Sequence, residues 1–242
     1  MKQLGLFFIF LGHLFTNREP FKIYINRIFD EAVSIGVGSV FIVSIVSSFI
    51  GAVTAVQTAY NLIAPYIPKT VIGLLVRDTT ILELAPTIMA IVLAGKVGSN
   101  IASELGTMRI TEQIDALEVM GINSASYLVL PKIIAFIFTY PMLVILAAFL
   151  SMLGGYIAGV LTDSVTPSQY IIGLRQDFVP FNVSFAMIKS VVFAFLIASI
   201  SSFKGYYTQG GALEVGKSST SAVTNSCIAI LLADFLLAQL LL

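Results

Sequence analysis

No charged residue occurs in AVSIGVGSVFIVSIVSSFIGAVTAVQTAYNLIAPYIP, the stretch from Ala32 to Pro68. A helix needs about 20 consecutive, mostly apolar residues to cross the hydrocarbon core of a bilayer. The stretch therefore predicts a first membrane span over residues 33–60, closed by a turn at Pro65 and Pro68. Because so long an apolar helix would be unstable in water, we expect an integral membrane protein.

The composition of the 242 residues supports the same class. Only 11% are charged and 57% are hydrophobic, whereas ordinary soluble domains carry roughly 25% charged residues. The formal net charge is zero, so nothing favours a nucleic-acid partner. One cysteine and one histidine are too few for a disulfide framework or a metal centre, so no metal is expected.

Four more apolar segments predict four more spans. Residues 133–162 carry no charge and give the third span. The second, fourth and fifth spans contain charges and are predicted at about residues 71–103, 183–203 and 219–242. The predicted fold is an all-α integral membrane protein, a single domain over residues 1–242. An odd number of spans places the two chain ends on opposite sides of the membrane.

Residues 1–31 predict an arm that lies at the membrane surface. The apolar run LGLFFIFLGHLF (Leu4 to Phe15) is too short to cross a bilayer. Cations at Arg18, Lys22 and Arg27 alternate with apolar residues, which favours an interfacial helix. An uncleaved signal anchor is the alternative, because no small-residue cleavage site follows the run.

Lysine and arginine are enriched in the cytoplasmic loops of membrane proteins. With Lys96 and Lys189 counted as intramembrane, the arm, the second loop and the fourth loop hold eight cations: Lys2, Arg18, Lys22, Arg27, Arg109, Lys132, Lys204 and Lys217. The opposite side holds three: Lys69, Arg77 and Arg175. This asymmetry predicts a cytoplasmic N-terminus and a C-terminus on the far side.

The second loop contains an acidic segment, MRITEQIDALEVMG (Met108 to Gly121). The segment predicts a helix whose apolar stripe and acids lie on opposite sides: Ile110, Ile114, Leu117 and Gly121 against Glu112, Asp115 and Glu118. A solvated amphipathic connector is one interpretation. The other is a contact with a basic groove on a cytoplasmic partner.

Three of the charged residues inside predicted spans are candidates for a buried polar site: Glu83, Lys189 and Asp234. Isolated charges are costly in a bilayer, so such residues usually face a partner or a cavity. Lys189 could bridge Glu83 or Asp234, either as an ion pair that holds the spans together or as a polar lining that meets a lipid headgroup. Pro86 frees the carbonyl of Leu82 and predicts a kink.

Small residues recur every four positions in the second span, at Gly98, Ala102 and Gly106. Such a stripe lets neighbouring helices approach closely, and Gly155 and Gly159 repeat the pattern in the third span. Lys96 lies beside the stripe and can extend its ammonium group to the cytoplasmic headgroups.

The segment GALEVGKS (Gly211 to Ser218) has the spacing of a phosphate-binding loop. Such a loop must follow a buried strand and open a helix of an α/β domain. A membrane span precedes this one and another follows it, so we interpret the segment as a loop without nucleotide.

On the opposite side of the membrane, TPSQYIIGLRQDFVPF predicts a short helix. Thr166 serves as its N-cap and Pro167 occupies its first turn. The helix is expected to show one apolar edge, made of Tyr170, Ile171, Leu174 and Phe178.

The run ELAPTIMAIVLAGKVGSNIASELGTMRITEQIDALEVMG (Glu83 to Gly121) resembles the signature of the MlaE/YrbE-type permeases of lipid-transporting ABC systems. The shared features are an acidic residue and a proline in the second span, a glycine-rich AG-basic-x-G stretch, an E-x-G-x-M turn and an E-Q helix. They occur here as Glu83 and Pro86, Ala94–Gly98, Glu104–Met108 and Glu112–Gln113. The position before Glu83, often arginine in that family, is Leu82.

The resemblance implies a permease subunit that moves phospholipid or a related lipid in the bacterial inner membrane, and that is not itself an enzyme. Its implied partners are a second copy of itself, a cytosolic ABC ATPase that binds ATP and Mg, a periplasmic MCE-domain protein that could contact the 166–178 helix, and membrane lipids. Residues 104–122 would form the ATPase-coupling region, with Glu104, Arg109, Glu112, Gln113, Asp115 and Glu118. No cofactor is implied in this chain. The competing hypothesis is an ion-coupled secondary transporter that uses Glu83, Lys189 and Asp234.

Overall fold

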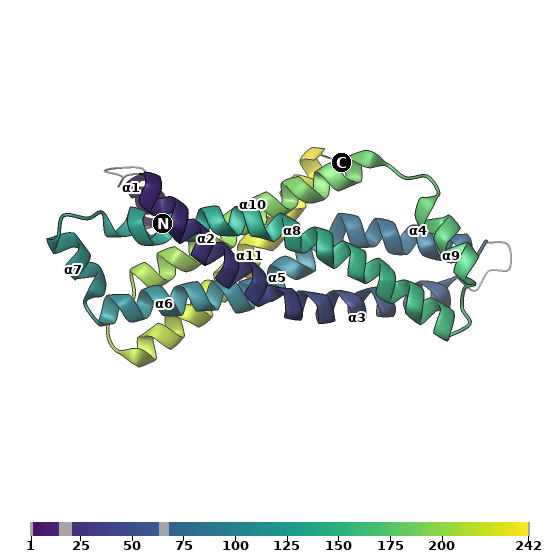
Figure 1. Cartoon of the computed structure of the whole chain (residues 1–242), viewed down its shortest axis with the longest axis horizontal. Coiled ribbons are helices and arrows are strands. Elements are labelled where there is room, and N and C mark those ends of the chain that lie inside the picture. The colour runs from purple at the N-terminus through teal and green to yellow at the C-terminus, as the bar shows by residue number, and fades with distance from the viewer. Residues whose placement is uncertain (1, 15–20, 63–67, 242) are drawn as a thin grey trace.

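The structure, a computed structural model, describes residues 2–14, 21–62 and 68–241, and all elements in these ranges are helical (Figure 1). The elements before the second loop are α1 (Lys2–His13), α2 (Phe21–Ala32), η1 (Val33–Val37), α3 (Gly38–Asn61), α4 (Thr70–Thr79), η2 (Thr80–Ile88), α5 (Met89–Leu93), η3 (Ala94–Gly98) and α6 (Ser99–Ile110). They are followed by α7 (Gln113–Val119), α8 (Ser124–Leu161), α9 (Pro167–Arg175), α10 (Pro180–Tyr206) and α11 (Ala212–Leu241). The η elements are π-helical turns.

Five helices in the described ranges are long and apolar enough to cross a membrane, which confirms the predicted number of spans. They are Tyr24–Asn61, Thr70–Ile110, Ser124–Leu161, Pro180–Tyr206 and Ala212–Leu241. Figure 1 shows an elongated bundle with α1, α7 and the α10–α11 turn at one end, hereafter the α7 end. Helix α9 lies at the other, hereafter the α9 end.

The N-terminal arm consists of two helices. Helix α1 packs on the end of α10, where the Phe7 and Phe10 rings lie 5.5 and 5.7 Å from the ring of Phe203. Helix α2 continues through η1 into α3 without a break. The predicted cation at Arg18 and the predicted turn at Pro65 lie outside the described residues.

Polar contacts hold helix α2 against α8. The hydroxyl groups of Tyr24 and Ser126 lie 2.8 Å apart, and the Arg27 guanidinium lies 3.8 Å from the centre of the Tyr127 ring. At 1.5 Å per residue, the 38-residue helix Tyr24–Asn61 is about twice as long as a hydrocarbon core of about 30 Å is thick. Its charged N-terminal part therefore projects beyond the apolar region.

The third span begins before its predicted boundary, at Ser124. The Asn123 side chain accepts a hydrogen bond from the Ser126 backbone and caps the helix. Lys132, the charge that set the predicted boundary, is buried and paired with Glu31 and Glu104. Because a paired lysine can remain inside a membrane-spanning helix, the third span begins nearer the N-terminus than predicted.

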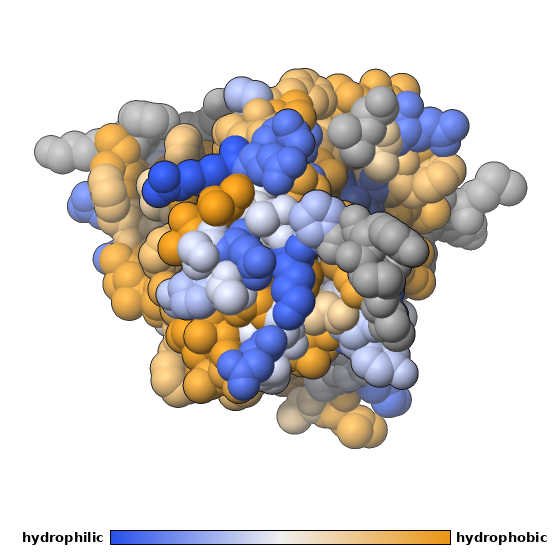
Figure 2. Space-filling model, turned by 90° about the vertical axis from the view of Figure 1, so that its right-hand side faces the viewer, coloured by the Kyte–Doolittle hydropathy of each residue, from blue (hydrophilic) through white to orange (hydrophobic). Residues whose placement is uncertain are grey.

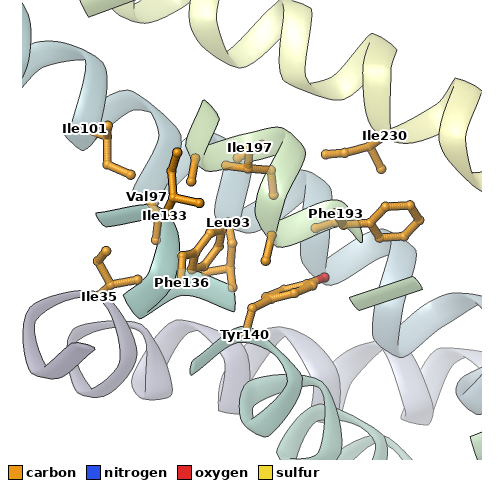
Figure 3. Packing of buried hydrophobic residues seen from close by; sticks show 14 of the residues in the cluster. Ile35, Leu93, Val97, Ile101, Ile133, Phe136, Tyr140, Phe193, Ile197 and Ile230 are labelled. Atoms are coloured by element: carbon orange, nitrogen blue, oxygen red, sulfur yellow. The ribbon is translucent and has the colours of Figure 1, made fainter. Parts of the chain in front are cut away.

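The apolar core draws on all five spans (Figure 3). Tyr140 and Phe136 of α8 face Leu93 of α5, while Phe193 of α10 lies nearby. The labelled residues that complete this core are Ile35, Val97, Ile101, Ile133, Ile197 and Ile230. By contrast, the flanks of the bundle expose large apolar side chains, which suits contact with lipid, among them Phe41, Phe49, Phe138, Phe149 and Phe235.

Glycines bring α3 and α8 into backbone contact. A Cβ atom on Gly51 would lie 1.8 Å from the carbonyl oxygen of Ser151, and one on Gly154 would lie 2.1 Å from the carbonyl oxygen of Ser48. Each helix therefore presents a glycine to the backbone of the other, and the two helices pack along much of their length.

The predicted small-residue stripe of the second span also packs closely, which confirms that interpretation. A Cβ atom on Gly98 would lie 2.8 Å from the Ser201 hydroxyl oxygen. The contact is reciprocal, because a Cβ atom on Gly205 of α10 would lie 2.6 Å from the carbonyl oxygen of Ala102. Helices α6 and α10 are thereby fixed together near the α7 end.

The α9 end has a polar centre surrounded by apolar surface. Figure 2 views the bundle from this end and shows hydrophilic residues gathered in the middle, with hydrophobic residues around them. This distribution is what a bundle needs when its end meets water and its flanks meet lipid.

Candidate functional site

The three intramembrane charges come together in one cluster, as the sequence indicated. The Lys189 ammonium lies 2.7 Å from a Glu83 carboxylate oxygen and 2.7 Å from an Asp234 carboxylate oxygen. Lys189 is fully buried, whereas the Glu83 side chain is 47% exposed and the Asp234 side chain 18%. These residues join the second, fourth and fifth spans, and Glu83 faces outward from the protomer.

The predicted backbone defect at Pro86 is part of the same cluster. Pro86 has no N–H, and the helix around it is π-helical over residues 80–88. The carbonyl oxygen of Leu82 accepts a hydrogen bond from Lys189 at 3.0 Å. The carbonyl oxygen of Pro86 accepts one from the buried Tyr140 hydroxyl. The carbonyls of Leu82 and Pro86 thus each accept a hydrogen bond from a side chain of another span.

Lys189 has three donors and three acceptors: Glu83, Asp234 and the Leu82 carbonyl. With all three side chains ionised, the cluster carries a net charge of one negative unit. Thr87 also belongs to it, because its hydroxyl lies 3.2 Å from Glu83 and 3.1 Å from Asp234. Sequence reasoning missed Thr87, although its position one helical turn after Glu83 was an available signal.

The second-loop segment is not one continuous helix, so the helical-wheel prediction for residues 108–121 was wrong. Helix α6 ends at Ile110, and Glu112 adopts a left-handed conformation with φ of 60° before α7 begins at Gln113. A left-handed residue costs about 1–2 kcal/mol. Full burial of Ile114 against α8 returns about 1.5–3 kcal/mol. The burial of Ile114 is therefore large enough to offset the left-handed conformation of Glu112.

Several charged residues predicted to be available for a partner are used within the chain. Arg109 pairs with Asp115 at 2.6 Å. Glu118 accepts hydrogen bonds from Ser124 at 2.9 Å and from Tyr206 at 3.0 Å.

Glu104 likewise has a partner within the chain. It pairs with the buried Lys132 at 2.8 Å, and Lys132 also pairs with Glu31 at 2.5 Å. These two contacts connect α2, α6 and α8, and the position of Lys132 in an apolar helix gave no signal of them. They fix the base of the second loop.

The tip of the second loop remains exposed. Glu112 and Gln113 are exposed at the start of α7, and Val119 and Met120 are 88% and 66% exposed at its end. This tip therefore presents apolar side chains beside the exposed acid Glu118.

Helix α9 forms as predicted at its start. The Thr166 side chain accepts from the Gln169 backbone and completes a capping box, and Pro167 occupies the first turn. The prediction that the helix has a single apolar edge was wrong. Tyr170 is buried against α8 and Ile171 is exposed, while Phe178 lies beyond the end of the helix. The chain turns after Arg175, which separates Phe178 from the others.

Arg77 attaches α9 to the second span. Its buried guanidinium donates to the carbonyl oxygens of Leu174, Gln176 and Asp177 at 3.0, 2.5 and 3.3 Å, and it pairs with Asp78 at 2.9 Å. These carbonyls belong to the unsatisfied C-terminal end of α9. The position of Arg77 gave no hint of this role, since the sequence suggested a surface cation.

The Arg77→Gln variant is expected to loosen α9, because the carbonyls at its end lose their charged donor. Backbone amides of residues 168–177 should exchange hydrogen at least about tenfold faster in detergent, given about 1.5–3 kcal/mol for a charged hydrogen bond. Amides of α6 serve as the internal control. Unchanged exchange at α9 would show that Arg77 does not hold it.

The segment from Gly211 to Ser218 does not form a phosphate-binding loop. No strand precedes it in the described part of the chain, and α11 begins at Ala212, inside the segment. Lys217 pairs with Glu214 at 2.6 Å, and the Ser218 hydroxyl donates to the Lys204 carbonyl. The residues that would hold phosphate and magnesium are therefore ordinary helix residues.

These features define a class: a helical multi-pass membrane protein with a charged cluster inside its spans and an exposed loop helix at one end. Comparison with known proteins gives the family. The family model described as Permease MlaE matches residues 28–240. This protein therefore belongs to the MlaE permease family of ABC transporters.

Relatives support the assignment over the whole chain. A probable ABC transporter permease protein of Rickettsia bellii is 37% identical over 239 residues, which cover 99% of this chain and 92% of that protein. One from Synechocystis sp. is 34% identical and covers 99% of this chain and 91% of its own length. The chloroplastic protein trigalactosyldiacylglycerol 1 of Arabidopsis thaliana is 32% identical over 90% of this chain and 62% of its own length.

Proposed function

We propose that this permease moves a phospholipid or a related lipid between the bacterial inner membrane and a periplasmic MCE-domain partner. A separate cytosolic ATPase, which binds ATP and Mg, drives the movement, and two copies of the chain form the permease unit. In this arrangement the α7 end faces the cytoplasm and the α9 end faces the periplasm. The N-terminus is then cytoplasmic and the C-terminus periplasmic.

The observation that carries the ATPase contact is the exposed tip of the second loop. Glu112, Val119 and Met120 are solvent-exposed there, while the base of the loop is fixed by the ion pair of Glu104 with Lys132. A loop that is rigid at its base and apolar at its tip can transmit a movement of the ATPase to the second and third spans.

The half-exposed carboxylate of Glu83 supports the lipid part of the proposal. Lys189 is saturated by its three acceptors, so the excess negative charge resides on Glu83 and Asp234. In a bilayer such a charge usually faces a cavity or a partner. It can meet a polar headgroup on the side of the membrane that faces the α9 end.

The Glu112→Lys variant tests the contact with the ATPase. Glu112 has no ion-pair partner among the described residues, so its reversal leaves the internal pairs of the loop intact. We expect co-purification with the ATPase to fall by at least about tenfold, the effect of about 1.4 kcal/mol, while membrane insertion is unchanged.

The matched control is Glu214→Lys, which reverses another exposed acid at the α7 end that pairs only locally with Lys217. The Glu214→Lys variant should co-purify with the ATPase to the same extent as the unchanged chain. Undisturbed association of the Glu112→Lys variant would contradict the coupling role of this tip.

Reconstituted vesicles distinguish the proposal from an ion-coupled secondary transporter. Lipid movement by the permease–ATPase complex should stop without ATP and should continue in the presence of a protonophore. The opposite pattern would favour ion coupling through Glu83, Lys189 and Asp234, which membership in an ABC permease family does not favour.

A further inference from the structure

A polar groove opens between the first, second and fifth spans, away from the Glu83 cluster. Its volume is about 470 Å³, and seven of its nine lining residues carry a hydroxyl, amide or ammonium group: Ser34, Ser39, Lys96, Ser99, Asn100, Ser103 and Ser219, with Ile35 and Val97 as the other two. None of these lining residues is acidic. Its only charge is the ammonium of Lys96.

The groove lies in the opposite half of the membrane from the Glu83 cluster. Glu83 and Lys96 belong to the same long helix and are separated by about 20 Å at 1.5 Å per residue. In a hydrocarbon core of about 30 Å, that separation places Lys96 in the half nearer the α7 end. The groove is thus a separate site.

Two of the three π-helical turns meet at this groove. Turn η1 supplies Ser34 and Ile35, and turn η3 supplies Lys96 and Val97. The Lys96 ammonium donates to the carbonyl oxygen of Gly38, directly after η1, and so connects the two turns. Isolated π-helical turns inside α-helices are frequent at functional sites.

The donors of the groove exceed the acceptors available to them. The Lys96 ammonium has three donors, and no carboxylate of the described chain lies within ion-pair distance of it. Ser39 is 1% exposed, and its hydroxyl has no hydrogen-bond partner among the described residues. A buried hydroxyl without a partner costs about 1–3 kcal/mol, so a ligand that accepts hydrogen bonds would recover that loss.

The ligand that fits is a singly charged anion with several acceptor oxygens. One ammonium neutralises one negative charge, and the hydroxyls of Ser39 and Ser103 and the amide of Asn100 can donate to further oxygens. A phosphodiester has this charge and these acceptors. On the flank beside the groove, Val37 and Phe41 are 67% and 76% exposed, which places apolar surface next to it for acyl chains.

We propose that this groove, formed by Lys96, Ser39 and Asn100, binds the phosphodiester of a phospholipid in the leaflet nearer the α7 end. The site is a second lipid position, in addition to the outward-facing Glu83 cluster. That the phosphate belongs to a lipid rests on the proposed function. That the groove binds a phosphate rests on the residues that line the groove.

The test measures lipid retained by the detergent-purified full-length chain with native mass spectrometry. Phosphatidylglycerol and a diacylglycerol with the same acyl chains are the probes. The unchanged chain should retain phosphatidylglycerol and not diacylglycerol. Lys96→Gln should weaken retention by at least about tenfold, because a charge-assisted hydrogen bond is lost, and Lys96→Arg should restore it.

Two matched variants keep the result interpretable. Lys217→Gln removes an exposed cation at the α7 end and should change nothing. Ser39→Ala leaves the charge in place and should weaken retention less than Lys96→Gln does. Equal retention of both probes, or full retention by a folded Lys96→Gln variant, would overturn the proposal.

Two further readouts identify the source and the place of binding. Excess inorganic phosphate should not displace phosphatidylglycerol, and displacement would overturn the assignment to a lipid. A photocrosslinking residue at Asn100 should label phosphatidylglycerol. A crosslink to a second copy of the chain, with no lipid product, would show that protein fills the groove. No ATPase or MCE partner is present in these assays, so their outcome is independent of the transport test.

Discussion

Replacing Lys189 with methionine is expected to lower the free energy of unfolding by about 3 kcal/mol or more, because removing one partner of a buried ion pair leaves an uncompensated charge. Two carboxylates would then lie close together without the ammonium that lies 2.7 Å from each. The half-exposed Glu83 can gain solvation, which keeps the effect at the low end of about 3–5 kcal/mol. Unfolding in mixed detergent measures the loss.

Two companion variants separate the charge from the packing at this position. Asp234→Asn should cost less, since Lys189 keeps Glu83 and the Leu82 carbonyl as acceptors. The triple variant Glu83→Gln, Lys189→Met and Asp234→Asn should regain much of the stability, because no charge remains unpaired. A Lys189→Met chain as stable as the original would mean that the cluster does not hold the spans together, which would leave ligand contact as its role.

The Gly51→Ala variant should be destabilised by about 3 kcal/mol, the upper range for overpacking. Its new methyl group would lie 1.8 Å from the Ser151 carbonyl oxygen, a distance that no side-chain movement can relieve. Helices α3 and α8 would have to separate. Gly154→Ala should behave alike, since its Cβ would lie 2.1 Å from the Ser48 carbonyl oxygen.

Gly216→Ala is the control for this pair, because nothing lies within 4 Å of its Cβ position. In the middle of a helix, alanine replaces glycine with a gain of about 0.5–1 kcal/mol. The control should therefore unfold at the same or higher detergent concentration. If Gly51→Ala matched it, the close contact of α3 with α8 would not be needed for stability.

The spans could be predicted from the sequence because the bilayer imposes a local rule. About 20 apolar residues in a row suffice to identify a span, whatever the rest of the chain does. The same rule explains the errors at the ends. Lys132 set the predicted start of the third span, yet a charge paired with Glu31 and Glu104 is tolerated within a helix.

The charged cluster could be predicted only in part. The cost of unpaired charge in lipid required Lys189 to find Glu83 or Asp234, and the structure gives it both. Pro86 predicted a free carbonyl at Leu82, but the sequence did not indicate that Lys189 would donate to it. Thr87 was missed because a threonine in a span usually bonds to its own helix backbone.

The coupling segment shows where pattern reasoning fails. Periodicity placed Ile114 and Glu112 on one helix, but periodicity assumes that the helix axis continues. In the structure the chain bends at Glu112, and Ile114 is buried in the core. The acids then take different partners: Asp115 pairs with Arg109, and Glu118 binds Ser124. None of these contacts is local enough to appear as a motif.

The sequence by itself determined that this chain is a five-span helical membrane protein with charges that must be paired, since these follow from the energy of single residues in lipid. Only the tertiary structure decided which charges pair, where glycine brings α3 against α8, and that Lys96 and Ser39 line one groove. The physical reason is distance along the chain. Contacts between two helices depend on how each helix is rotated about its axis and how far it is shifted along that axis relative to the other. The spacing of residues within one helix does not specify either quantity.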